Sequence, residues 1–191
     1  MFKKYILIIL FPVAVWASED EYVIDKSHFS VGFLVEHVGY AKTLGMFKDI
    51  DGSYIHDVTN KKIKDIKIVI KTSSVFTNDE KRDEHLMSPD FLYVEKYPEM
   101  VFEATDIKID DDESIINGNL TLLGITKPLI LTGKINKIGK YPFGGIIKPY
   151  VMGISARGTI KRSDHAMMYA IKDNLVGDEI DLIIEFEARR Q

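Results

Sequence analysis

The sequence predicts an all-β domain of about eight antiparallel strands with one short helical segment. Beyond the first seventeen residues, apolar and polar side chains mostly alternate one by one, which is the period of a β-strand. Residues that favour turns, chiefly Gly, Asn and Asp, separate these alternating runs. Many evenly spaced antiparallel strands are typical of a β-sandwich or an up-and-down barrel.

The N-terminus has the composition of a secretory signal peptide. Lys3 and Lys4 precede an apolar run over residues 5–15, and Ala17 supplies a small residue at the expected cleavage position. The run is too short to span a bilayer comfortably as a helix, although a membrane anchor is the alternative. We therefore expect a signal peptide at 1–17, cleavage after Ala17, a periplasmic location and a mature domain at 18–191.

The alternating runs give the predicted strands in chain order. The runs cover residues 29–37, 43–55, 66–71, 100–105, 116–122, 129–135, 152–160 and 182–186. The segment 137–149 contains three Gly and two Pro, so we expect a long loop there, at a barrel mouth.

The segment 78–97 interrupts the strand pattern with charges at helical spacing. Asn78 is a candidate N-cap for a first helix. Ser88 followed by Pro89 predicts an N-cap and the first residue of a second helix. Phe91 would then point inward. A helical segment in the middle of an all-β chain can close one end of a barrel.

Charge and cysteine content narrow the function. The formal net charge is −4, and removal of Lys3 and Lys4 makes it −6. An acidic protein does not favour nucleic acid or anionic lipid surfaces, so we expect neither nucleic acid binding nor stable membrane insertion. The chain has no Cys, which excludes disulfides, thiol chemistry and Cys-ligated zinc. The fold must then rely on its core alone.

The inward face of the predicted strands is apolar. An eight-stranded barrel can either fill with side chains or hold one small ligand, and apolar residues stabilise both arrangements. The candidates for ligand contact on this face and in the helical segment are Phe33, Val35, Phe47, Ile68, Phe91, Phe102, Leu120, Leu122 and Ile154.

Three polar residues are candidates for contact with a ligand headgroup. Arg82 and His85 lie three residues apart, on one face of the predicted helix, where a cation could meet a phosphate, hydroxyl or quinone oxygen. The alternative is local, with Arg82 and Asp83 pairing with barrel residues to fix the helical segment. His37 ends an inward-facing strand and could donate to a headgroup, or could be a satisfied interior histidine.

Several elements together resemble the YceI-like polyisoprenoid-binding proteins. The resemblance covers the whole predicted mature chain, and its most specific elements are Asp25-Lys26-Ser27-His28, Arg82-Asp83-Glu84-His85-Leu86, Gly118 to Pro128, and Arg162-Ser163-Asp164. It implies an eight-stranded, lipocalin-like barrel over 18–191 that encloses an isoprenoid chain in the periplasm. It also makes a homodimer a reasonable expectation.

We expect a carrier, with no catalytic residues, no metal and no cofactor other than a bound isoprenoid lipid, which could be a polyprenol, a polyprenyl phosphate or a quinone. No helical metal motif, nucleophile elbow, phosphate loop or dinucleotide fingerprint is present in the sequence. Two alternatives remain open. One is an enzyme on the same scaffold acting on a bound quinone or lipid, with His28, His37 and His85 converging on a metal. The other is a filled barrel that serves as an interaction module for a membrane redox or stress-response protein.

Overall fold

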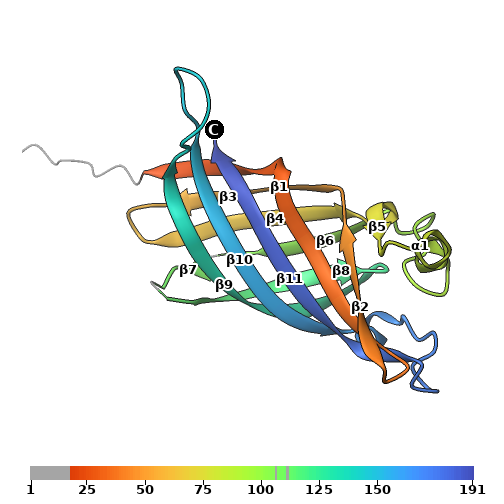
Figure 1. The fold of residues 1–191 in the computed structure, drawn as a ribbon. Helices are drawn as coiled ribbons and strands as arrows, with labels where there is room; N and C mark the ends of the chain where they lie inside the picture. The colour runs from red at the N-terminus through yellow and green to blue at the C-terminus, as the bar shows by residue number, and fades with distance from the viewer. Residues whose placement is uncertain (1–17, 106, 111) are drawn as a thin grey trace, which may run out of the picture.

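The chain forms a barrel whose strands wind around one axis (Figure 1). The computed structural model describes residues 18–105, 107–110 and 112–191. The predicted signal peptide and its cleavage after Ala17 lie outside the described residues. Within the described part, no helix is long and apolar enough to cross a membrane.

Eight strands close the barrel, as predicted. The described strands are β1 (Glu19–His37), β2 (Ala41–Phe47), β3 (Ile50–Asp57), β4 (Lys62–Lys71), β5 (Val75–Phe76), β6 (Glu99–Ala104), β7 (Ile107–Lys108), β8 (Ser114–Leu122), β9 (Ile125–Lys140), β10 (Tyr150–Lys161) and β11 (Val176–Arg190). The closed path runs β1-β3-β4-β6-β8-β9-β10-β11, and antiparallel pairing of β11 with β1 completes it. The short strands β2, β5 and β7 add to this barrel at its ends.

Strand β1 pairs with two different strands along one of its edges. Its first part pairs with β3, and its second part, from Val31 to His37, pairs with β2. The single strand predicted over 43–55 is therefore wrong, because it is two strands that follow each other along β1. The strand is interrupted between β2 and β3 at Lys48 and Asp49. The backbone N–H groups of both residues donate to the Ser74 hydroxyl at 3.1 Å.

The helical segment contains one helix, α1 (Glu80–Met87), and the candidate second helix at Ser88 does not form. Its N-cap is Asp79, whose side chain accepts from the Arg82 N–H at 2.9 Å, whereas Asn78 adopts a left-handed conformation with φ of 64°. Ser88 ends α1 in extended backbone instead of starting a second helix. Because a residue before proline, here Pro89, is disfavoured in the helical region, α1 cannot continue past Ser88. The chain then forms turns, in which the Phe91 and Tyr93 N–H groups both donate to the Ser88 carbonyl.

The barrel is packed solid at the end opposite α1. The rings of Tyr22 and Tyr54 stack with centroids 5.4 Å apart, and the Tyr54 hydroxyl donates to the Met152 sulfur at 3.3 Å. Met152 and Ala188 are completely buried beside them. Burial raises the pKa of Tyr54 well above its usual value. We call this layer, which also contains the buried side chains of Ile63 and Ile107, the tyrosine floor.

We expect Tyr54→Ala to lower the free energy of unfolding by about 3–5 kcal/mol, because it removes a ring that is only 2% exposed and leaves a cavity. Urea denaturation followed by circular dichroism measures this change. Tyr40→Ala is the matched control, because the Tyr40 ring is 91% exposed and its removal should change stability by less than about 0.5 kcal/mol. Equal effects of the two substitutions would contradict a packed floor.

Candidate ligand-binding cavity

The barrel encloses a cavity of about 670 Å³ above the tyrosine floor. Tyr54, Ile63 and Ile107 belong to both the floor and the cavity lining, so the cavity ends there. From the floor it extends along the barrel to α1, which contributes Arg82 and His85. Its size falls within the range of about 300–1,000 Å³ that is usual for small-molecule sites.

All twelve residues predicted for ligand contact lie on the wall of this cavity. Strand alternation accounts for the apolar residues on strands, because successive side chains of a strand point to opposite faces, whereas Phe91 comes from the turn after α1. Their contact with a ligand stays a prediction. The twelve are Phe33, Val35, His37, Phe47, Ile68, Arg82, His85, Phe91, Phe102, Leu120, Leu122 and Ile154.

The middle of the barrel is hollow. Ile68, Phe102, Ile116 and Ile184 point into the cavity, yet each keeps part of its surface accessible. A filled barrel would instead interdigitate such side chains at the density of a protein interior. The alternative of a barrel filled with side chains is therefore not what the structure shows.

Glycines within the strands make room for neighbouring side chains. A Cβ added at Gly118 would lie 2.3 Å from the Phe102 ring, and one added at Gly133 would lie 2.5 Å from Ile116. Both positions admit the close approach of a wall side chain. These glycines thus let the Phe102 and Ile116 side chains lie close to the barrel wall.

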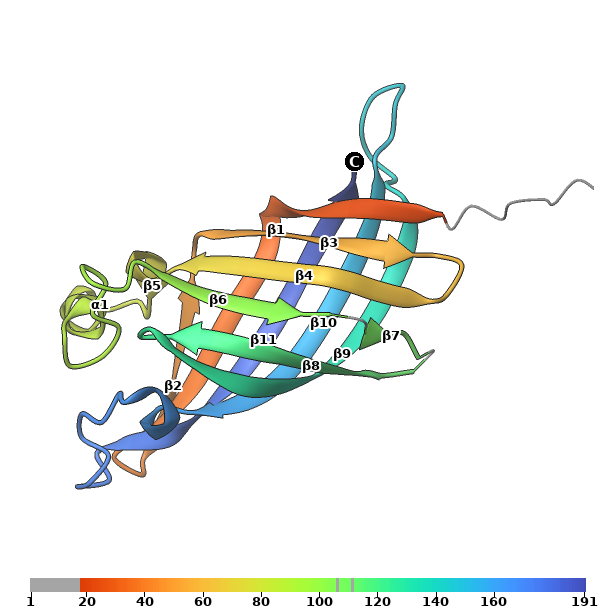
Figure 2. The same cartoon turned by 180° about the vertical axis from the view of Figure 1, so that it is seen from behind.

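The cavity opens at the α1 end, which we call the mouth. Three segments meet there: the β1–β2 turn, α1, and the β10–β11 loop over residues 162–175 (Figure 2). The Val38 N–H donates to the Leu175 carbonyl at 2.9 Å and joins the first of these segments to the third. Most lining residues that are exposed gather at the mouth, namely Glu36, His37, Val38, Lys81, Arg82, Tyr169 and Leu175.

An aromatic cluster spans the mouth and joins the helical segment to the β10–β11 loop. The His85 ring contacts Phe91 and Tyr169 at centroid distances of 5.0 and 4.9 Å, and Phe91 lies 5.1 Å from Tyr169. The Asp90 carboxylate lies 2.9 Å from His85 Nε2. His85 therefore has protein partners at the mouth, of which Tyr169 was not among the predicted residues.

Arg82 is held by the chain that precedes α1. Its Nε donates to the Thr77 hydroxyl at 2.7 Å, and its Nη2 donates to the Thr77 carbonyl at 2.6 Å. Asp83 accepts from the Thr77 N–H at 2.8 Å and from its hydroxyl at 2.6 Å. Arg82 and Asp83 thus form local bonds that fix the helical segment, as the alternative to headgroup contact expects. Arg82 nevertheless also lines the cavity.

Arg162 is a cavity residue that the sequence analysis did not select. Its side chain is buried, with 1% of the residue exposed, and its guanidinium lies 5.8 Å from the Phe91 ring centroid. Burial lowers its pKa, and the charge of Asp178 opposes this change. The guanidinium fastens one loop to the barrel by donating to the carbonyls of Met167, Tyr169, Val176 and Gly177.

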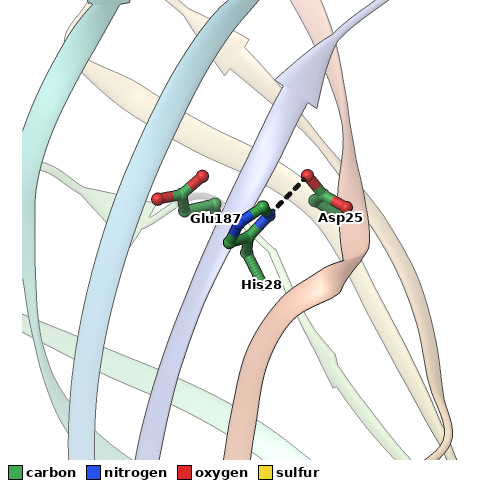
Figure 3. Close-up of side chains that lie close together, drawn as sticks. All are labelled: Asp25, His28 and Glu187. Atoms are coloured by element: carbon green, nitrogen blue, oxygen red, sulfur yellow. Dashed lines mark hydrogen bonds and ion pairs between the residues drawn. The ribbon is translucent and has the colours of Figure 1, made fainter. Parts of the chain in front are cut away.

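The histidines proposed for a metal do not converge. His28 and His37 lie nine residues apart on β1, which corresponds to roughly 30 Å of strand. His28 instead lies between Asp25 and Glu187, with possible ligand atoms within 4.8 Å of one another (Figure 3). One Glu187 oxygen is buried without a protein hydrogen bond. This group went unnoticed in the sequence because Glu187 comes from β11.

Asp25 already has strong partners at this position. The Arg189 guanidinium lies 2.6 Å from the Asp25 carboxylate, which also accepts from the Ser27 N–H at 3.0 Å. Burial raises the pKa of Asp25, but the hydrogen bonds from Ser27, His28 and Arg189 outweigh it and hold the pKa far below its usual value. The bonds span the register shift of β1 on β11 after Ile24, so they clamp the closing seam of the barrel.

Comparison with known proteins shows the family of the chain. The model of the YceI-like domain matches residues 22–188. The chain belongs to the YceI-like family. Protein YceI of Escherichia coli O157:H7 is 41% identical over 179 residues, which cover 92% of this chain and 90% of that protein.

Solved structures share the fold. The crystal structure of Campylobacter jejuni YceI protein is 32% identical, with a TM-score of 0.72 over 82% of this chain and 90% of that one. A polyisoprenoid binding domain from Saccharophagus degradans, implicated in plant cell wall breakdown, aligns with a TM-score of 0.60 over 90% of this chain and 98% of that one. At 11% identity, this second likeness concerns the fold alone.

We expect Arg162→Met to loosen the mouth of this YceI-like barrel. Its carbonyl partners lose their donors, so the free energy of unfolding should fall by about 3 kcal/mol. Amide hydrogen exchange should become faster in the β10–β11 loop. Arg157→Met is the control on β10, the strand that Arg162 directly follows, because Arg157 is exposed and paired with Glu185, a kind of pair worth about 0–1 kcal/mol. Unchanged exchange in the loop would contradict this role of Arg162.

We expect Asp25→Asn to destabilise the protein in a pH-dependent way. Because folding lowers the pKa of Asp25, the carboxylate contributes stability above its unfolded pKa of about 4, and this contribution is lost as the pH falls. The stability difference between the protein and the variant should therefore be about 1 kcal/mol smaller at pH 3 than at pH 7. Urea denaturation at both pH values measures it, and a pH-independent difference would show that the charge plays no part.

Proposed function

We propose that this protein is a periplasmic carrier that holds one isoprenoid lipid inside its barrel. The observation that carries the proposal is the hollow apolar cavity, closed by the tyrosine floor and open at the mouth. Its wall is built almost entirely from aliphatic and aromatic side chains, which suit a long hydrocarbon without polar groups. The polar side chains at the mouth would face the headgroup.

The free energy of transferring a lipid into the cavity favours transport over permanent storage. Each buried CH₂ gains about 0.8 kcal/mol relative to water, so a chain of about 20 carbons nears the practical affinity limit of about 18–21 kcal/mol. A lipid that comes from a membrane gains little, because bilayer and cavity are both apolar. The cavity would therefore exchange its lipid with membranes and shield it from water in between.

The ligand class and the location have further support. A structure that shares this fold is described as a polyisoprenoid binding domain, which agrees with the shape and lining of the cavity. The periplasmic location rests on the signal peptide predicted at residues 1–17. We propose binding without catalysis, because the Asp25–His28–Glu187 group is not part of the cavity lining. A homodimer remains our expectation, which light scattering would test.

Mass spectrometry of the organic extract tests the proposal directly. The protein is exported, purified from the periplasm without detergent and extracted. A stoichiometric polyprenol, polyprenyl phosphate or isoprenoid quinone is the expected result. Trace phospholipid alone, together with failure to take up added isoprenoids, would overturn it.

Two neighbouring isoleucines give a matched pair of variants for the cavity. Ile116 points into the cavity, whereas Ile115 is exposed on the outer face. We expect Ile116→Trp to occupy ligand space and weaken isoprenoid binding by roughly tenfold or more, a loss of about 1.4 kcal/mol or more. Ile115→Trp should bind as the parent does. Titration with a fluorescent isoprenoid measures both, and equal affinities would place the ligand outside the cavity.

A further inference from the structure

The loop between β9 and β10 exposes large apolar side chains. This β9–β10 loop, residues 141–149, projects from the barrel at the end opposite the mouth (Figures 1 and 2). Phe143 is 74% exposed, Ile147 is 90% exposed and Ile146 is fully exposed. Single exposed apolar residues are ordinary, but three on one short loop indicate an interaction surface.

The loop holds these side chains in a closed hairpin. The Tyr141 N–H donates to the Pro149 carbonyl at 2.8 Å, and the Lys148 ammonium donates to the Pro142 carbonyl at 2.9 Å. The Tyr141 ring lies 6.1 Å from the Phe143 ring. The apolar tip is therefore presented away from the barrel with its own backbone bonded at the neck.

The charge around the loop is uniformly positive in sequence. Although the whole chain has a net charge of −4, the segment 114–163 contains no Asp or Glu. Its eight basic residues are Lys127, Lys134, Lys137, Lys140, Lys148, Arg157, Lys161 and Arg162. The net charge of the whole chain therefore does not describe the charge of this segment, although Glu185 and Glu187 of β11 lie opposite Ser155 and Gly153 of β10.

Three of these lysines flank the apolar tip. Lys137 and Lys140 precede the loop and Lys148 lies within it, and all three are exposed. Among the described residues, none of the three forms an ion pair with a carboxylate, in contrast to Arg157 with Glu185. The ammonium groups of Lys137 and Lys140 can bind an external anion, and so can the Lys148 donors that do not bond the Pro142 carbonyl.

We propose that the β9–β10 loop docks the barrel on an anionic lipid bilayer. Phe143, Ile146 and Ile147 enter the interface, and the flanking lysines contact headgroup phosphates. Apolar side chains next to basic ones are the combination that holds a protein on such a surface, since burial of apolar area and attraction to anionic lipids add together. The surface is independent of the ligand in the cavity.

The rim of the mouth is the competing surface. It also exposes apolar residues, including Tyr40, Leu44 and Met168, but acidic groups accompany them, among them Glu36 and Glu84. An anionic surface repels those carboxylates. Residues 141–149 themselves contain no Asp or Glu, so we favour the β9–β10 loop over the mouth.

Tryptophan fluorescence tests the proposal, because Trp16 is the only tryptophan of the chain. In the expressed chain with Trp16→Phe, we compare Ile147→Trp in the loop with Tyr40→Trp at the mouth. The probes are vesicles of phosphatidylethanolamine and phosphatidylglycerol that contain brominated lipid. We expect a blue shift and quenching for Ile147→Trp alone, and neither on pure phosphatidylcholine. Circular dichroism verifies that both variants are folded.

Charge removal supplies the second readout. The combined substitution Lys137→Gln, Lys140→Gln and Lys148→Gln should weaken vesicle binding roughly tenfold or more, and the remaining binding should depend less on salt.

Three results would overturn the proposal. Quenching of Tyr40→Trp in place of Ile147→Trp would assign docking to the mouth. A blue shift of Ile147→Trp that grows with protein concentration in the absence of vesicles would assign the loop to a second copy of the chain. Absence of a vesicle-dependent change in both variants would show that neither surface binds lipid.

Discussion

The antiparallel pairing of β11 with β1 is the constraint on which the rest of the structure depends. It runs from Tyr22 opposite Arg190 to His37 opposite Val176 and turns an open sheet into a closed wall. Without it, both long strands would be free edges, and the apolar face that they enclose would meet water. The Asp25 clamp lies where the register of this seam shifts, so its ion pair with Arg189 helps to hold the barrel closed.

The two ends of the barrel are built by different physical means. The floor is apolar, close-packed and formed by the strands themselves. The mouth is formed by a helix and a loop, held by rings around His85 and by the Arg162 guanidinium, whose partners are backbone carbonyls. Segments fixed by a few polar contacts open at lower cost than packed strands. This difference leaves one end rigid and the other able to move.

The sequence was sufficient to predict what depends on local alternation, and insufficient where distant segments meet. Strand parity placed Phe33, Ile154 and the other wall residues correctly, because period-two patterning survives folding. It could not show that β1 changes neighbours along its length. Ser88–Pro89 was misread as a helix start, because serine suits both ends of a helix. The bonds of Arg162 had no sequence signature, since any residue can offer a carbonyl.

The tyrosine floor closes one end of the cavity, so the mouth is the end through which a ligand can pass. If the cavity holds a lipid as proposed, that lipid would enter and leave by the same route, with its hydrocarbon end in first and its polar end out first. The distance from Tyr54 to the aromatic cluster at His85 would then limit the length of the ligand that fits inside the cavity. A ligand shorter than the cavity would leave empty space, and a longer one would keep its headgroup outside.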